Sequence, residues 1–403
     1  MIYRSQEERD ANGPDSRMIL SKPNAVITYA GTKIINGVDT DIPCVVVGVR
    51  AKVNKSELSD SELIPSQLAS GSITDVVVFP EIKPITTCIS GFGGECPPHG
   101  DRYRPLIGGI SACYIPYTGL SVSATLGVIA KDLTDGRLVG LTNNHVCGVQ
   151  YDPNYNIPDG GTVGARSDVI GHNMLQPSNG DGGVSPADVF GRIKRIVPIK
   201  FDYPAYVGYN TVEAGIVDIG INDAKTDILD IGPGPFPFFD KADCNVSDFV
   251  QKSGRTTGLT PAIYGSDATI YQKYVSVVVE YGSWHSDWAI FHNQMWISSE
   301  DRFCQGGDSG SVIAMEIGGV VGIIGLLYAS SADGLSTFAC YIEDVASALN
   351  IESWNGDIVV PHNAASTIDV NGKCYVWQED TSEPSTHTAG GAWTDCDDCA
   401  ASL

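Results

Sequence analysis

Short apolar runs separated by turn residues fill most of the 403-residue chain. In three places two such runs follow one another in the way that a β-hairpin requires. The paired runs are residues 121–130 with 138–146, 274–281 with 289–298, and 311–315 with 320–328. Asp135-Gly136 and Gly318-Gly319 lie within the first and the last pair, and such dipeptides favour tight hairpin turns. The pattern therefore predicts a mainly antiparallel β core.

The first part of the chain has a different pattern. Residues 1–22 are charged and polar, and we expect a flexible N-terminus there. Strand-like runs then follow at residues 25–29, 43–49 and 75–79. Leucines among acids and serines in residues 54–68 predict a short helix, broken near Pro65. We interpret residues 23–82 as a small α+β N-terminal unit.

Residues 83–358 form the predicted main body, and a change in composition marks residues 359–403 as an appended C-terminal module. A helix is expected near the end of the main body, where apolar residues recur at helical spacing: Ile342, Val345, Ala346 and Leu349. The module carries Cys396-Asp397-Asp398-Cys399, half of a zinc site that Cys374 and His387 would complete. A disulfide or free thiols fit this pair equally well, so no metal is assigned.

Charge and composition narrow the classes of partner. The formal net charge is −23, which argues against nucleic acid because phosphate binding needs a basic surface. The N-terminal residues lack the apolar core of a signal peptide, and no run approaches the ~18 apolar residues of a membrane span. We therefore expect a cytoplasmic protein without membrane partners, whose 11 cysteines are mostly buried thiols. The composition leaves the oligomeric state open.

The strongest chemical motif is Gly307-Asp308-Ser309-Gly310. On a tight glycine-flanked turn, the N–H groups of Gly307 and Ser309 can point at one spot beside the Ser309 hydroxyl, which supplies a nucleophile and an oxyanion hole together. His145 follows an apolar strand and a short polar run, and is the candidate general base because a histidine takes a serine proton well at pH 7. Histidine before serine is one of the known triad orders.

The acid between them is less sharply defined. Glu213 and Asp218 both lie in an acid–apolar–small–apolar pattern, five residues apart. On one extended strand they would face opposite sides, so at most one of them can hold the histidine. Asp188 is a third and weaker candidate.

Several segments together resemble chymotrypsin/trypsin-like serine proteases, and more closely the Narrow Leaf-type family of plant and bacterial trypsin-like proteins. The segments are residues 104–111, 141–146, 251–258, 307–311 and 325–329. The resemblance extends over about residues 40–350 and implies two antiparallel β barrels with the site in the cleft between them. The Asn-Thr-Val-Asp pattern of that family falls on residues 210–213, so the resemblance makes Glu213 the leading acid and Asp218 a shifted substitute.

The same resemblance places the substrate pocket. Its floor would be Phe303, six residues before the serine, and its wall would include Leu327 and Tyr328. An aromatic floor does not favour a basic side chain, so we expect a small or apolar residue before the cleaved bond.

Two further motifs have less specific interpretations. Lys33-Ile34-Ile35-Asn36-Gly37 resembles a zymogen activation site, but it lies too far before His145, and a β-turn at Asn36-Gly37 is the better interpretation. Asp308 then needs another partner. Arg255, in the loop of residues 252–258, either binds an anion or belongs to a plain turn.

The sequence therefore predicts a serine endopeptidase that acts on a peptide or protein substrate and needs no cofactor. Two alternatives are a non-catalytic module that binds a partner peptide, and a self-processing protein whose own N-terminal unit or tail is the substrate.

Overall fold

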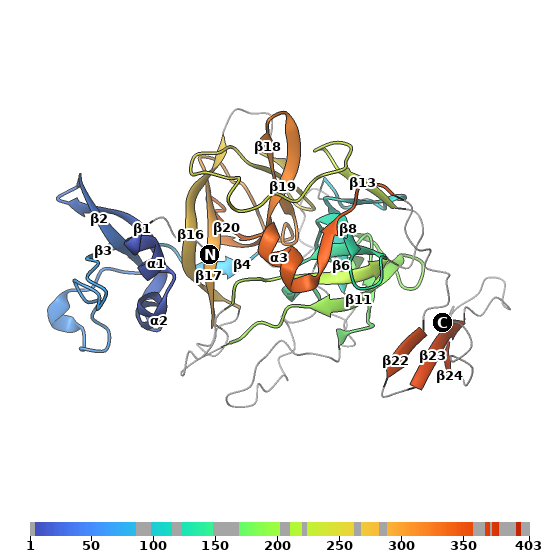
Figure 1. The fold of residues 1–403 in the computed structure, drawn as a ribbon, viewed down its shortest axis with the longest axis horizontal. Coiled ribbons are helices and arrows are strands. Elements are labelled where there is room, and N and C mark those ends of the chain that lie inside the picture. The colour runs from blue at the N-terminus through green and yellow to red at the C-terminus, as the bar shows by residue number, and fades with distance from the viewer. Residues whose placement is uncertain are drawn as a thin grey trace.

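The computed structural model describes residues 5–85, 98–114, 123–147, 169–201, 210–219, 224–261, 267–281 and 288–357, and the backbone of 367–370, 373–378 and 392–395. Within these residues the protein is mostly β with few helices, as the apolar pattern predicts. Two large sheets contain most of the strands (Figure 1). No helix in these ranges has the length and apolar character of a bilayer-spanning segment.

The first sheet carries the His145 side of the site. Its eight described strands are ordered β21 (Ile351–Ser353), β8 (Val128–Asp132), β9 (Leu138–Thr142), β12 (Gly215–Ile219), β11 (Val189–Ile196), β10 (Asn173–Leu175), β6 (Ile110–Tyr114) and β7 (Ala124–Leu126). Neighbouring strands are antiparallel throughout. Beside it, β5 (Leu106–Gly108) pairs in parallel with β13 (Ala224–Ile228).

The second sheet carries the Ser309 side. Its described strands run in the order β15 (Gly258–Thr260), β14 (Gln251–Gly254), β18 (Val312–Ile317), β19 (Val320–Ser331), β20 (Ser336–Tyr341), β17 (Trp288–Ser299), β16 (Ala268–Glu280), β1 (Ala25–Ile35), β2 (Val38–Val49) and β3 (Thr74–Val78). A further short strand, β4 (Ile82–Pro84), pairs with β19 off this path. The three predicted hairpins are confirmed as β8–β9, β16–β17 and β18–β19.

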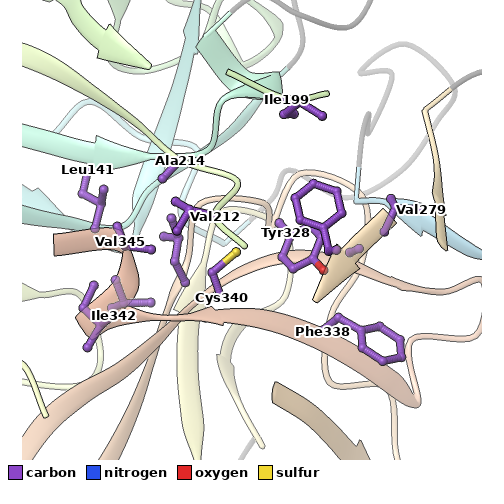
Figure 2. Packing of buried hydrophobic residues seen from close by; sticks show 14 of the residues in the cluster. Leu141, Ile199, Val212, Ala214, Val279, Tyr328, Phe338, Cys340, Ile342 and Val345 are labelled. Carbon is purple, nitrogen blue, oxygen red and sulfur yellow. The ribbon is translucent and has the colours of Figure 1, made fainter. Parts of the chain in front are cut away.

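An apolar core joins the two sheets. Figure 2 shows Leu141 of β9 in the same cluster as Val279, Tyr328, Phe338 and Cys340 of the second sheet. The predicted helix is confirmed as α3 (Ile342–Leu349), whose buried residues belong to this cluster. Burial of one continuous apolar surface fixes the two sheets against each other, and polar segments at their junction are thereby brought close together.

The N-terminal residues form two helices instead of the expected flexible segment: α1 (Gln6–Ala11) and α2 (Pro14–Leu20). The Ser5 hydroxyl accepts a hydrogen bond from the Glu8 N–H and caps α1, and Pro14 begins α2. Ile19 and Leu20 are fully buried with residues of β1 and β2. The polar composition of residues 1–22 therefore predicted too little structure, because capping and packing hold the two helices in place.

Residues 54–68 do not form the expected helix. Only a 3₁₀ turn, η1 (Lys55–Glu57), appears there. The side chains of Asn54 and Glu62 accept hydrogen bonds from the nearby backbone N–H groups of Ser56 and Ser59. Such local side-chain bonds compete with helical backbone bonds, which explains the difference.

The N-terminal strands continue the second sheet, because β1 pairs with β16 (Figure 1). Asn36 and Gly37 turn the chain between β1 and β2 with φ of 52° and 81°, so the predicted β-turn is confirmed. A separate three-stranded sheet follows the main body: β22 (Thr367–Val370), β23 (Lys373–Gln378) and β24 (Ala392–Asp395). Cys374 lies on β23, whereas His387, Cys396 and Cys399 lie outside the described residues.

Candidate active site

His145 lies in a short 3₁₀ turn, η2 (His145–Cys147), just after β9 ends. Its side chain is fully buried. The preceding polar run explains this position, because the Asn143 side-chain amide donates a 2.8 Å hydrogen bond to the Glu213 carbonyl oxygen. The loop that carries the histidine is thus tied to the segment that carries the candidate acid.

Glu213 contacts His145 directly. Its Oε1 accepts hydrogen bonds from the His145 backbone N–H at 2.8 Å and from Nδ1 at 3.0 Å. A carboxylate on Nδ1 keeps the proton on that nitrogen and leaves the lone pair of a neutral imidazole on Nε2. Nε2 has no hydrogen-bond partner among the described residues. The geometry is therefore that of an oriented general base.

The other two candidate acids lie elsewhere. Asp218 is on β12 and lies 3.5 Å from the Arg137 guanidinium. Asp188 accepts a hydrogen bond from Arg102 at 2.9 Å. The structure thus brings Glu213, and neither aspartate, to His145.

The pair is shielded from water by aromatic rings. Tyr281 packs edge-on against the His145 ring, with centroids 6.3 Å apart. Burial, and next the negative Glu213, hold the pKa of Tyr281 well above its usual value. Burial also raises the pKa of Tyr328, with Cys340 and Glu213 adding to it. Both phenols are therefore neutral at pH 7.

The nucleophile turn is built around Asp308. Its Oδ1 accepts from the N–H groups of Thr256 and Thr257, and its Oδ2 from the Thr257 hydroxyl and the Gln305 N–H. Lys252 Nζ lies 3.4 Å from Oδ2, with both side chains fully buried. Lys252 is therefore the partner of Asp308 that sequence reasoning had not identified.

Ser309 meets the backbone of a distant segment. Its Oγ donates a 2.8 Å hydrogen bond to the Ile85 carbonyl oxygen. The Gly307 N–H donates to the same oxygen at 3.2 Å. The second expected oxyanion donor, the Ser309 N–H, makes no hydrogen bond to that carbonyl in the described structure. The Ser309 hydroxyl and the Gly307 N–H thus meet at a single carbonyl oxygen.

No hydrogen bond joins Ser309 to His145 within the described residues, but their loops are linked. The Thr125 N–H donates to the Ser309 carbonyl at 2.8 Å, and the Thr125 hydroxyl to the Gly307 carbonyl at 2.9 Å. The Thr142 hydroxyl in turn donates to the Thr125 carbonyl at 2.8 Å. Thr142 precedes His145 by three residues, so the nucleophile turn of the second sheet is bonded beside the histidine loop of the first.

Arg255 binds an anion, but that anion belongs to the chain. Its guanidinium donates to Asp181 Oδ2 at 2.7 Å and to Oδ1 at 2.5 Å. The Ser111 and Ser178 hydroxyls also donate to Asp181. Burial alone would raise the pKa of Asp181, but the bonds from Arg255 and Ser111 outweigh it and lower the pKa below its usual value. No sequence motif singled out Asp181.

The expected pocket residues surround the backbone that meets Ser309. Phe303 and Leu327 are buried in the same cluster as the Ile85 side chain, which is 4% exposed. The Tyr328 carbonyl accepts a 3.1 Å hydrogen bond from the Ile85 N–H. Tyr328 thus contacts this segment through its backbone, while its ring packs against Phe291.

Cysteines offer no competing nucleophile among the described residues. Six free thiols are described, and all are buried: Cys44, Cys113, Cys147, Cys244, Cys304 and Cys340. Burial raises the pKa of Cys304, which is five residues before Ser309, to about 11. A thiol with that pKa is protonated at neutral pH and is a weak nucleophile. The described part of the chain also holds no cluster of metal ligands.

Comparison with known proteins gives a likeness in structure only. No protein-family model and no curated protein matches this chain. Solved structures similar to it include a glutamic-acid-specific serine protease that uses a histidine triad in substrate binding (16% identity, 62% of this chain and 100% of that chain, TM-score 0.39). Another is Nocardiopsis protease, at 16% identity over 61% of this chain and 97% of that chain, with a TM-score of 0.37. A third is Cellulomonas bogoriensis chymotrypsin, at 15% identity over 62% of this chain and 98% of that chain, with a TM-score of 0.37. The chain is thus similar, at low identity, to chymotrypsin-fold serine proteases. At these TM-scores the likeness assigns neither a subfamily nor an activity.

Proposed function

We propose that this protein is a serine endopeptidase of the chymotrypsin type, with motifs that resemble the Narrow Leaf-type proteins and with its two sheets as the two barrel halves. One observation carries the proposal. The Ser309 hydroxyl and the Gly307 N–H both donate to the same peptide carbonyl oxygen, so the candidate nucleophile lies beside a carbonyl that an expected oxyanion donor already holds. The oriented His145–Glu213 pair on the adjoining loop supplies the base.

The proposed reaction follows from these positions. The Ser309 hydroxyl turns from the carbonyl oxygen toward His145 Nε2, which takes its proton as Oγ attacks the carbonyl carbon. Glu213 stabilises the imidazolium that forms. The Gly307 and Ser309 N–H groups hold the oxyanion, and the imidazolium then protonates the leaving amine. Water hydrolyses the acyl-enzyme in the reverse sense, and no step calls for a cofactor.

The site also indicates the substrate class. The partner that fits it is a peptide in extended form, with an apolar residue before the cleaved bond because Phe303 and Leu327 form a buried apolar wall. The net charge of −23 and the absence of a basic groove motif speak against nucleic acid as a substrate.

A second candidate function is peptide binding without catalysis. The observation that favours it is the hydrogen bond of Ser309 to Ile85 in place of His145. In that function the cleft would hold an extended peptide while the serine stays unactivated.

Labelling with a small fluorophosphonate separates the two. The Ile85 carbonyl lies against Ser309 and would hinder the reagent, so labelling is measured in the wild type and in Ile85→Asp. In that variant a carboxylate would lie in the apolar cluster, and its burial cost would displace residues 82–85 from the serine. We expect a single label on Ser309, none in Ser309→Ala, and a rate reduced about 10²–10⁴-fold in His145→Ala.

The matched control is Ser311→Ala, because among the described residues the hydroxyl of Ser311 bonds to the Asp308 carbonyl and to neither His145 nor Ile85, so its loss should not matter for labelling. An Ile85→Asp protein that is not labelled at Ser309 would contradict the endopeptidase and favour the binding module.

A further inference from the structure

Residues 82–85 lie along an open strand edge that leads to Ser309. The strand β18 pairs with β19 only as far as Leu326, but β19 continues to Ser331. Along this remaining edge β4 pairs antiparallel with β19, in the register Pro84 with Ala329 and Lys83 with Ser330. A short segment added to a free sheet edge is one of the usual ways in which proteins bind extended peptides.

The next residue, Ile85, also forms a backbone hydrogen bond to β19. Its N–H donates to the Tyr328 carbonyl at 3.1 Å, which extends the ladder by one bond. Its side chain belongs to the buried cluster that includes Phe303 and Leu327. The Ile85 side chain therefore lies with Phe303 and Leu327, which are the expected floor and wall of the specificity pocket.

The carbonyl of Ile85 completes the arrangement. Its oxygen accepts the hydrogen bonds from Ser309 Oγ and the Gly307 N–H that were described above. A strand with a purely structural role would need only the backbone hydrogen bonds to β19. Here the side chain also lies in the cluster of the expected pocket, and the carbonyl oxygen lies beside the Ser309 hydroxyl, which has only to turn toward His145 to face the carbonyl carbon.

We propose that this protein cleaves its own chain after Ile85, and that residues 82–85 are the acyl side of that substrate, bound in cis. The proposal rests on the proposed endopeptidase and names its first substrate. Ser309 Oγ forms a bond to the Ile85 carbonyl carbon, and the bond from that carbon to the nitrogen of residue 86 breaks. The Oγ proton passes through His145 Nε2 to the leaving amine. Water then adds its hydroxyl to the Ile85 carbonyl carbon and passes its other proton through His145 to Ser309 Oγ, and the carboxylic acid that is released loses its proton to solvent.

The N-terminal fragment would stay bound after the cut. Strand β1 pairs with β16, and the Asn12 side chain accepts a hydrogen bond from the Asn293 N–H at 3.1 Å. Residues 1–85 would therefore remain on the protein without a covalent link, with the new carboxylate facing Ser309.

The test is the intact mass of the purified full-length chain, measured after denaturation. We expect the wild type to give fragments 1–85 and 86–403 that co-elute under native conditions, and Ser309→Ala to stay whole. A half-time that is unchanged on tenfold dilution would show that the cut occurs in cis. Ile85→Asp should slow the cut by at least about 100-fold, since a carboxylate would have to enter an apolar pocket. Ile85→Val should retain it, as should the matched control Lys83→Ala on the exposed side of the same strand.

Fluorophosphonate labelling of Ile85→Asp keeps the two proposals apart. A wild-type chain that stays whole while this variant is labelled at Ser309 would overturn self-cleavage and leave the endopeptidase standing. A cut at another bond, or a cut that Ile85→Asp does not slow, would also overturn the assignment of Ile85. If Ser309 is labelled in no variant, the endopeptidase itself fails.

Discussion

Two buried carboxylates lie at the two halves of the site, and they are bonded in opposite ways. Asp308, behind the nucleophile turn, has both oxygens engaged by backbone N–H and hydroxyl donors, and Lys252 Nζ forms an ion pair with it. Glu213, beside His145, has one oxygen engaged by a single residue, and its Oε2 has no partner among the described residues.

The difference indicates that the two carboxylates have different roles, one in structure and one in reactivity. A saturated carboxylate with a cationic partner holds a loop in shape, because every lone pair is fixed by a neighbour. A carboxylate that the described residues bond only through the backbone N–H and the ring of one histidine keeps its charge available for the moment when that ring becomes cationic. We therefore expect loss of Glu213 to affect reactivity, and loss of the Asp308 partner to affect stability.

The largest effect is expected for Glu213→Gln. The amide keeps the shape but loses the charge that favours the imidazolium, so labelling of Ser309 should slow by about 10²–10⁴-fold. The free energy of unfolding should change little, since the amide oxygen still accepts from the His145 N–H. Rates of fluorophosphonate labelling and urea unfolding measure the two quantities.

Asp218→Asn is the matched control for Glu213→Gln, because Asp218 pairs with Arg137 away from the histidine. Equal slowing by the two variants would contradict the assignment of Glu213 as the acid that orients His145.

Lys252→Met tests the saturated carboxylate. It leaves Asp308 buried without its counter-charge, and breaking a fully buried pair in this way costs about 3–5 kcal/mol of unfolding free energy. The double variant Lys252→Met/Asp308→Asn should recover a large part of that loss, since no uncompensated charge remains. If the single variant costs less than about 1 kcal/mol in urea unfolding, the pair does not hold the turn.

The smallest expected effect concerns Asp181, a second saturated carboxylate. Because its pKa is lowered in the folded state, its contribution to stability is present above the unfolded pKa of about 3.9 and is lost as the pH falls through the lower folded value. Asp181→Asn should therefore cost about 1–3 kcal/mol at pH 7, and the difference from wild type should shrink toward pH 3. A difference that stays constant from pH 7 to pH 3 would contradict this role.

Much of the framework was predictable from local patterns. Alternating apolar runs around Asp135-Gly136 and Gly318-Gly319 predicted hairpins that the structure contains, because turn chemistry acts over a few residues. The helical spacing from Ile342 to Leu349 was equally local. By contrast, residues 5–20 are as polar as a free terminus, and their helices depend on packing against β1 and β2, which their own sequence does not contain.

The sequence by itself determined which residue types are present for the chemistry: the Gly307-Asp308-Ser309 turn, a histidine at a strand end, and three candidate acids between them. Only the tertiary structure decided that Glu213 reaches His145, that Lys252 meets Asp308, and that the Ile85 carbonyl lies against Ser309. The reason is separation along the chain, which is 224 residues for Ile85 and Ser309. Such pairs meet because two sheets bury a common apolar surface, and no motif within either segment encodes that meeting.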